Sequence, residues 1–199
     1  MPPQARKAVP QKGKTLDWSH NRDMWIRVLE KKTGKGLNHW NTRIKKHKFT
    51  DARSLKAWLA DEGVSGYAGQ LLVMERFGYP DFVTTSAGKL IDEQYADRPH
   101  LRPIYEAIIR AARDLGEFVI QVRKGFVSLV TPRRTFARVQ ATTKRRVDLG
   151  LRIEGIKPSG RLQPSRIHET MKLQISFMKP EEVDAEARRW LKKAYDENS

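Results

Sequence analysis

The spacing of the apolar residues changes once along this chain, from a helical period to the period of a strand, and this change constrains the fold more than any other feature. In the first part, apolar side chains recur every three or four residues, as in Trp25, Val28 and Leu29, which marks one face of a helix. After Gly116 they alternate with polar residues, as over residues 147–153, which is typical of a strand. The sequence therefore predicts an α+β fold, with helices first and a sheet second.

The first part is expected to form a small domain of four short helices. They are predicted over residues 21–33, 37–48, 51–62 and 66–77. Gly34, Gly63 and Gly78 follow three of them and suit the residue after a helix end. A tryptophan in each of the first three gives the domain a core.

The second part is expected to form an antiparallel sheet of about four to five strands, flanked by an N-terminal and a C-terminal helix. The helices are predicted over residues 101–115 and from Pro180 onwards. The strands are predicted over residues 118–122, 126–130, 147–153 and 171–177, with a further segment around 136–141.

These patterns divide the chain into four segments. Residues 1–14 read as a disordered basic arm, because they contain prolines and cations but almost no apolar side chain. The helical domain follows over residues 15–80, a linker with one short helix over residues 81–100, and the α+β domain over residues 101–199.

The chain is strongly basic, and the surplus charge is local. Its formal net charge is +16, with 39 Lys and Arg against 23 Asp and Glu. Residues 1–50 hold thirteen cations and three acids, and residues 131–166 hold ten and two. A local surplus of this kind indicates a surface for a polyanion such as nucleic acid. The absence of cysteine and of a long apolar run predicts a cytoplasmic protein without a membrane span.

The sequence predicts no catalytic residue, no metal site and no cofactor. Residues 13–15 resemble the end of a phosphate-binding loop, but Ala8 stands where the first glycine of that motif is required. None of the five histidines has a second ligand at helical spacing. Asp148 is expected to face solvent and to form an ion pair with Arg146 on the sheet surface, since it alternates with apolar residues.

The candidate anion-binding residues are the cations of the two basic stretches. In the helical domain they are Lys31, Lys32, Lys35, Arg43, Lys45, Lys46 and Lys48, and in the α+β domain they are Arg133, Arg134, Lys144, Arg145, Arg146 and Arg152. The sequence does not predict whether the two sets form one surface, nor the oligomeric state.

Several motifs resemble a bacterial family of uncharacterised two-domain proteins. In that family, a helical domain of unknown function precedes a second domain that is labelled a "predicted transport protein". The first part is similar in residues 32–40 (KTGKGLNHW), 55–59 (LKAWL) and 62–68 (EGVSGYA), and the second in 101–105 (LRPIY), 115–116 (LG), 126–129 (FVSL), 136–137 (FA), 146–151 (RVDLGL) and 190–195 (WLKKAY). The resemblance supports the two-part architecture, and the transport label is not evidence of transport.

The leading functional hypothesis is a non-enzymatic module that binds an anionic partner, nucleic acid, through phosphate contacts. One alternative is a small-ligand or protein-interaction domain with incidental charge, which a deep apolar pocket would favour. Another is an accessory subunit of a nucleic-acid-processing system, which would need a catalytic partner.

Overall fold

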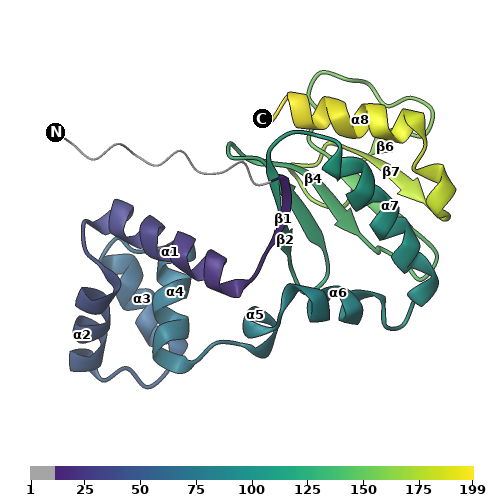
Figure 1. The fold of residues 1–199 in the computed structure, drawn as a ribbon. Helices are drawn as coiled ribbons and strands as arrows, with labels where there is room; N and C mark the ends of the chain where they lie inside the picture. The colour runs from purple at the N-terminus through teal and green to yellow at the C-terminus, as the bar shows by residue number, and fades with distance from the viewer. Residues whose placement is uncertain (1–11) are drawn as a thin grey trace. The chain divides into compact units, whose positions relative to one another are not determined.

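The computed structural model describes residues 12–199, and these form two units. The helical unit is Asp17–Ser86, and the sheet unit consists of residues 12–16 with Ala87–Ser199. Helices dominate the first unit and a sheet with flanking helices forms the second, which confirms the predicted α+β class (Figure 1). No helix within residues 12–199 is both long and apolar enough to cross a bilayer.

The helical unit contains the four predicted helices and one further short helix. They are α1 (Trp18–Thr33), α2 (Leu37–His47), α3 (Ala52–Asp61), α4 (Gly66–Phe77) and α5 (Asp81–Thr84). Its core is built from Leu29, Ile44, Leu55 and Leu71, all of which are almost fully buried. Burying one face of each helix stabilises helices that would be marginal in isolation.

Local sequence sets two of the helix boundaries in this unit. Gly34 ends α1 in the left-handed conformation, with φ 66°, and its N–H donates to the carbonyl of Glu30 at 2.8 Å. Glycine adopts this conformation without a steric penalty. Asp51 begins α3 as its N-cap, where its carboxylate accepts hydrogen bonds from the backbone N–H groups of Arg53 and Ser54.

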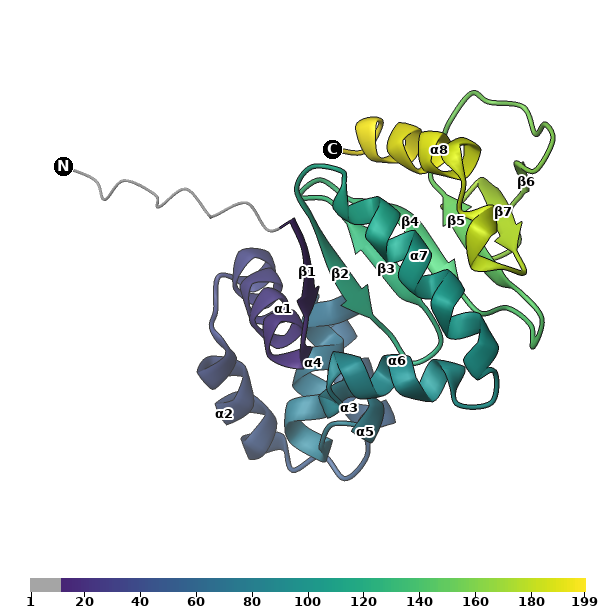
Figure 2. The same ribbon diagram turned by 45° about the vertical axis from the view of Figure 1, so that its right-hand side comes forward.

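The sheet unit has seven strands, in the order β1-β2-β3-β4-β5-β7-β6. They are β1 (Lys12–Leu16), β2 (Phe118–Val122), β3 (Val127–Val130), β4 (Thr135–Gln140), β5 (Val147–Leu151), β6 (Gln163–Pro164) and β7 (Leu173–Phe177). β1 pairs with β2 in parallel at one edge of the sheet (Figure 2), and all other pairings are antiparallel.

The sheet differs from the predicted antiparallel sheet of about four to five strands in having seven strands and one parallel pairing. The sequence did not predict β6, which has only two residues, or β1. Residues 12–14 were assigned to the disordered arm, but Lys12 and Lys14 pair with β2, with a shift in register at Gly13 between them. A strand edge can bond the backbone of any sequence that reaches it. Residues 1–11 of the predicted arm lie outside the described residues.

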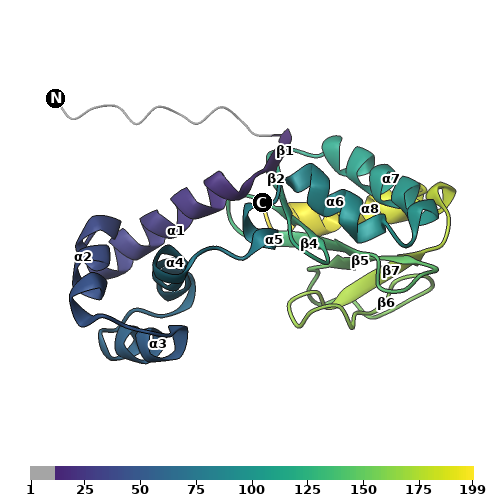
Figure 3. The ribbon, with the colours of Figure 1, turned by 90° about the horizontal axis from the view of Figure 1, so that it is seen from below.

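Helices cover one face of the sheet. They are α6 (Ala87–Tyr95), η1 (Pro99–Leu101), α7 (Arg102–Arg113), η2 (Pro180–Glu182) and α8 (Ala185–Asp196). Figure 3 shows α6, α7 and α8 on the same side of the sheet. The core between the layers contains Phe118, Phe136 and Phe177, all fully buried. α6 also contributes Leu90 and Ile91 to this core, so half of the predicted linker is an integral part of the unit.

The other side of the sheet, which we call the helix-free face, is less exposed than the sequence predicted. All five residues of β5 are buried, including Asp148 and Gly150, which were expected to face water. The reason is that the connection between β5 and β7 folds back over this strand. A Cβ atom on Gly150 would lie 3.1 Å from Cβ of Met171 and 3.3 Å from Cδ1 of Ile167, so the covering segment packs directly against the glycine.

Candidate nucleic-acid interface

The exposed face of α2 is polar and contains no acidic residue. Trp40 and Ile44 are buried on the inner side of the helix, whereas His39, Lys45 and Lys46 are exposed on the outer side. The eleven residues of α2 give the helix a length of about 16 Å. Lys45 and Lys46 also lie in the last turn, where a positive charge interacts favourably with the helix dipole.

Five of the seven predicted cations in the helical unit are exposed and unpaired. We call them the α2 lysines, and they are Lys31, Lys35, Lys45, Lys46 and Lys48. Within residues 12–199, none of them forms an ion pair. Lys31 lies in the last turn of α1 and Lys35 in the loop before α2, whereas Lys45, Lys46 and Lys48 lie at the C-terminal end of α2. Lys32 differs, because its Nζ donates to Oγ of Ser65 at 2.9 Å.

Arg43 also differs from the α2 lysines. Its side chain contacts Trp40 on α2, Trp58 on α3 and Glu62 directly after α3. Its Nη1 and Nη2 donate to the two carboxylate oxygens of Glu62 at 2.7 and 2.8 Å. Its Cζ lies 5.2 Å from the ring centroid of Trp40 and 5.0 Å from that of Trp58. The bond to Glu62 raises the pKa of Arg43 and lowers that of the carboxyl group. Arg43 therefore fastens α2 to the end of α3, and a phosphate contact would require this pair to break.

In the sheet unit, the six predicted cations lie at opposite ends of the hairpin formed by β4 and β5. Arg133 and Arg134 lie in the turn before β4, and Arg152 follows β5, where its N–H donates to the carbonyl of Phe136. Lys144, Arg145 and Arg146 lie in the turn between the two strands. Because β4 has six residues, the two groups are about 20 Å apart. The structure does not bring these six cations together.

The group at the start of β4 interacts with the end of α8. Nη1 of Arg133 and Nη2 of Arg134 donate to the carbonyl of Glu197 at 3.3 and 3.4 Å. This carbonyl belongs to the last turn of the helix, whose unpaired carbonyls attract cations. A depression of about 380 Å³ beside Arg134 is also lined by Glu154 and Glu169, so its charge is mixed and anion binding is not favoured there.

The group in the turn between β4 and β5 has varied surroundings. Nζ of Lys144 lies 3.8 Å from Oδ2 of Asp97. The backbone N–H of Arg145 donates to Oγ1 of Thr143, and the side chain of Arg145 is exposed. Nε of Arg146 lies 3.2 Å from Oδ1 of Asp148, which confirms the predicted ion pair.

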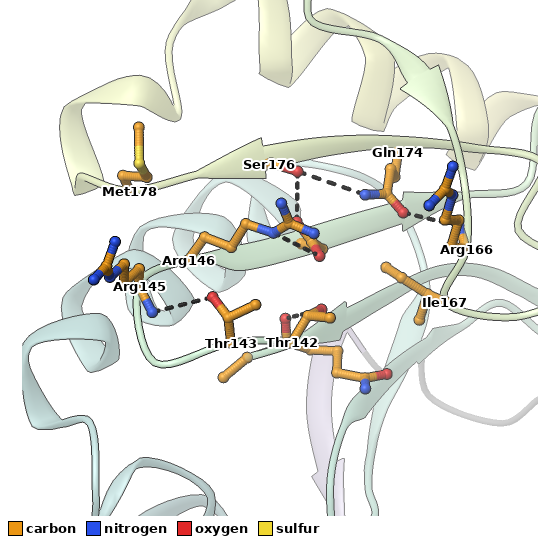
Figure 4. Close-up of polar contacts among 12 residues, drawn as sticks. Thr142, Thr143, Arg145, Arg146, Arg166, Ile167, Gln174, Ser176 and Met178 are labelled. Carbon is orange, nitrogen blue, oxygen red and sulfur yellow. Dashed lines mark hydrogen bonds and ion pairs between the residues drawn. The ribbon is translucent and has the colours of Figure 1, made fainter.

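Asp148 is the centre of a hydrogen-bond network on the helix-free face. Figure 4 shows the other members, Arg146, Ser176 and Gln174, along the neighbouring strands. The side chain of Asp148 is 1% exposed, whereas that of Arg146 is 43% exposed. Oγ of Ser176 donates to Oδ1 of Asp148 at 2.5 Å, and Nε2 of Gln174 donates to Ser176 at 3.5 Å. The backbone N–H of Arg166 donates to Oε1 of Gln174. The buried carboxylate is thus satisfied, as a charge at this depth must be.

Sequence reasoning missed Gln174 and Ser176 as partners of Asp148. Both alternate with the apolar residues of β7, and this alternation was the available signal that they share one face of the sheet. The register that places Asp148 opposite Ser176 and Gly150 opposite Gln174 follows only from the strand pairing. Among residues 12–199, no cluster of three His, Asp or Glu side chains could hold a metal ion.

Comparison with known proteins identifies a family. The model of the family described as Domain of unknown function (DUF5655) matches residues 91–198, which is just over half of the chain. The match begins within α6 and ends just after α8, so the whole helical unit lies outside it. No curated protein and no solved structure matches the chain.

Proposed function

The chain belongs to the family of the Domain of unknown function (DUF5655), and we propose that it is a non-enzymatic module that binds nucleic acid through phosphate contacts. We propose in addition that the protein is bacterial and cytoplasmic. The label "predicted transport protein" is not part of this proposal. Its main contact surface is the α2 face of the helical unit, with the cations of the sheet unit as a second contributor.

The observation that carries the proposal is the contrast between the α2 lysines and Arg43 within one segment. Arg43 is satisfied by Glu62, whereas the five lysines are exposed and have no carboxylate partner among the described residues. Lysine is a mobile point charge that suits phosphate contact without fixed geometry. Phosphate contacts of this kind supply affinity and position but do not read the base sequence.

The small-ligand alternative has weaker support in the described part of the chain. A depression of about 380 Å³ lies against α6, α7 and the edge strands, and Arg102, Arg110 and Arg113 contribute to its lining as well as isoleucines. Ligand sites are usually enclosed and mainly apolar. The accessory-subunit alternative shares the nucleic-acid contact and adds only a catalytic partner.

The proposal is tested by measuring how the full chain binds a labelled DNA duplex, a single DNA strand and an RNA as the salt concentration rises. We expect log K to fall linearly with log salt for the wild type. Replacing Lys45, Lys46 and Lys48 together by Glu should weaken binding to every ligand by at least about hundredfold at low salt, because three contacts become repulsive.

The matched control replaces Lys157, Lys172 and Lys179, which are exposed in the sheet unit, by Glu. It changes the net charge by the same amount and should weaken binding by less than about tenfold, since only long-range attraction is reduced. Equal losses in the two triple variants would mean that total charge, rather than the α2 face, drives binding. Absence of binding near physiological salt would rule out the proposal.

A further inference from the structure

Arg138 on the helix-free face of the sheet unit lacks a polar partner. It lies on β4 between Ala137 and Val139, whose side chains belong to the core on the opposite face. Its Cζ lies 3.3 Å from the ring centroid of Phe126, so the guanidinium stacks on the ring. Within residues 12–199 its side chain forms no hydrogen bond and no ion pair, and its Nε is buried without an acceptor.

Such an arrangement is costly in the absence of a ligand. The Arg138 side chain is half-buried, and its buried Nε–H has lost water without gaining an acceptor, which is unfavourable. Desolvation also lowers the pKa of Arg138. Stacking on Phe126 offsets only part of this cost. A bound anion would supply the missing acceptors, so the geometry indicates a site that is completed by a negatively charged group.

A second unpaired group lies beside Arg138 on the same strand. Gln140 faces the same side of the sheet two residues further on, and its Oε1 is buried without a hydrogen-bond partner in the described part of the chain. Only the amide NH2 of this side chain could donate to an anion, because Oε1 is an acceptor. Gln140 pairs with Asp148 across the two strands, and Arg138 pairs with Gly150. Unpaired polar atoms thus cluster next to the network around Asp148.

Arg146 adds donors that are already oriented. Only its Nε bonds to Asp148, and among residues 12–199 neither terminal nitrogen of its guanidinium has a hydrogen-bond partner. Asp148 is buried and is itself fixed by Ser176, so its contact with Nε positions the guanidinium on this face. Its two terminal NH2 groups remain available to form the two-pronged contact that arginine makes with oxyanions.

We propose that the face of β4 and β5 binds a phosphate group through the guanidinium groups of Arg138 and Arg146, with Asp148 as a positioning residue for Arg146. A phosphate group has enough acceptor oxygens to engage two guanidinium groups at once. The inference deepens the proposed function by adding a phosphate site on the sheet unit, and it rests on contacts within that unit alone. The phosphate can belong to a free phosphate ester or to a nucleic-acid backbone.

The test measures binding of inorganic phosphate, a 5′-mononucleotide and a DNA duplex to the full chain and to its Arg138→Gln and Arg146→Gln variants. Each variant should weaken binding of the phosphate-bearing probe by about tenfold or more, because a hydrogen bond to a charged group is lost. The matched control is Arg189→Gln, which removes an exposed charge on α8, on the other side of the sheet, and should change affinity by less than about twofold.

The three probes distinguish the two sources of the phosphate group. Weakened binding of phosphate and of the mononucleotide would assign the site to a small phosphate ester. Weakened binding of the duplex alone would assign it to a nucleic-acid backbone. If Arg138→Gln and Arg146→Gln bind all three probes as the wild type does, the inference is wrong.

The role of Asp148 has its own readout. Asp148→Asn should weaken phosphate binding and also shift the NMR signal of the Arg146 Nε–H group, which a purely structural role elsewhere would leave in place. Arg146→Lys, which keeps the charge, should not restore affinity, because lysine lacks the two-pronged geometry. Full affinity in Arg146→Lys would contradict the assigned role, and this variant decides the matter if Asp148→Asn does not fold.

Failure of this inference is separable from failure of the proposed function. The variant with Lys45, Lys46 and Lys48 replaced by Glu should retain phosphate and mononucleotide binding at the sheet unit. If that variant loses duplex binding while Arg138→Gln and Arg146→Gln have no effect on any probe, the proposed function stands and the phosphate site on β4 and β5 does not.

Discussion

The two basic stretches of this chain carry similar charge but are built in different ways. Residues 1–50 hold thirteen cations against three acids, and residues 131–166 hold ten against two. In the first stretch, the α2 lysines are exposed and unpaired in the described structure. In the second, arginines are fixed by the chain itself: Arg146 by Asp148, Arg161 by Asp184 at 2.7 Å, and Arg138 by the ring of Phe126.

This difference shows that a count of charges does not reveal which charges are available to a partner. Mobile lysines on a helix attract a polyanion from many directions and release its counterions on binding. Arginines held by carboxylates or rings contribute to the stability of the fold, and they offer a ligand only the donors that remain unused. We therefore expect substitution of an α2 lysine to affect binding more than stability, and substitution of a carboxylate that holds an arginine to affect stability strongly.

The largest effect on stability is expected from Asp148→Ala. The substitution leaves Arg146 and Ser176 without their shared partner, and loss of hydrogen bonds to a charged group costs about 2 kcal/mol. Urea unfolding followed by circular dichroism should show this loss in the free energy of unfolding. A loss below about 1 kcal/mol would mean that the network contributes little to the fold.

A smaller effect is expected from Asp184→Ala at the start of α8. Its carboxylate accepts a hydrogen bond from the N–H of Ala187 at 3.0 Å and is bonded to Arg161, and loss of such a cap costs about 1 kcal/mol. The N–H of Ala187 and the charge of Arg161 lower the pKa of Asp184. The stabilisation is therefore complete above the unfolded pKa of about 4 and is lost as the pH falls through the lower folded value.

Thermal unfolding of the wild type and of Asp184→Ala over a pH series measures this dependence. The difference in stability between the two proteins should be constant near neutral pH and should shrink below about pH 4. A difference that grows as the pH falls would contradict the assigned direction of the pKa shift.

The smallest effect on stability is expected from Lys45→Ala. Lys45 is exposed and unpaired in the described structure, so the free energy of unfolding should change by less than about 0.5 kcal/mol. The same substitution should reduce the salt dependence of duplex binding by about one unit in log K against log salt. A stability loss comparable to that of Asp148→Ala would remove the distinction between the two stretches.

Much of the fold could be predicted from the sequence because its signals are local. The spacing of apolar residues predicts α1 to α4 and most strands. The absence of acidic residues from α2 marks the α2 lysines as candidate binding residues. β1 could not be predicted, because residues 12–16 are mainly polar and their partner strand begins at Phe118. Pairing over such a distance leaves no local pattern in the sequence.

The partners of individual charged residues could not be predicted from local sequence patterns either. Arg43 and Glu62 are nineteen residues apart, and the burial of Asp148 depends on the segment that contains Ile167 and Met171 folding over β5. These contacts decide whether a cation is available, and they follow from tertiary packing rather than from composition. The sequence thus located the basic stretches but could not separate the α2 lysines from the arginines that the fold holds.

The most direct test of this account compares the salt dependence of duplex binding in three forms of the full chain. They are the wild type, a variant with Lys45, Lys46 and Lys48 replaced by Gln, and a variant with Arg133, Arg134 and Arg152 replaced by Gln. In the lysine variant, the slope of log K against log salt should be shallower than in the wild type by about three units. In the arginine variant, the slope should change by less than about one unit. An unchanged slope in the lysine variant, with a loss of about three units in the arginine variant, would contradict the central claim.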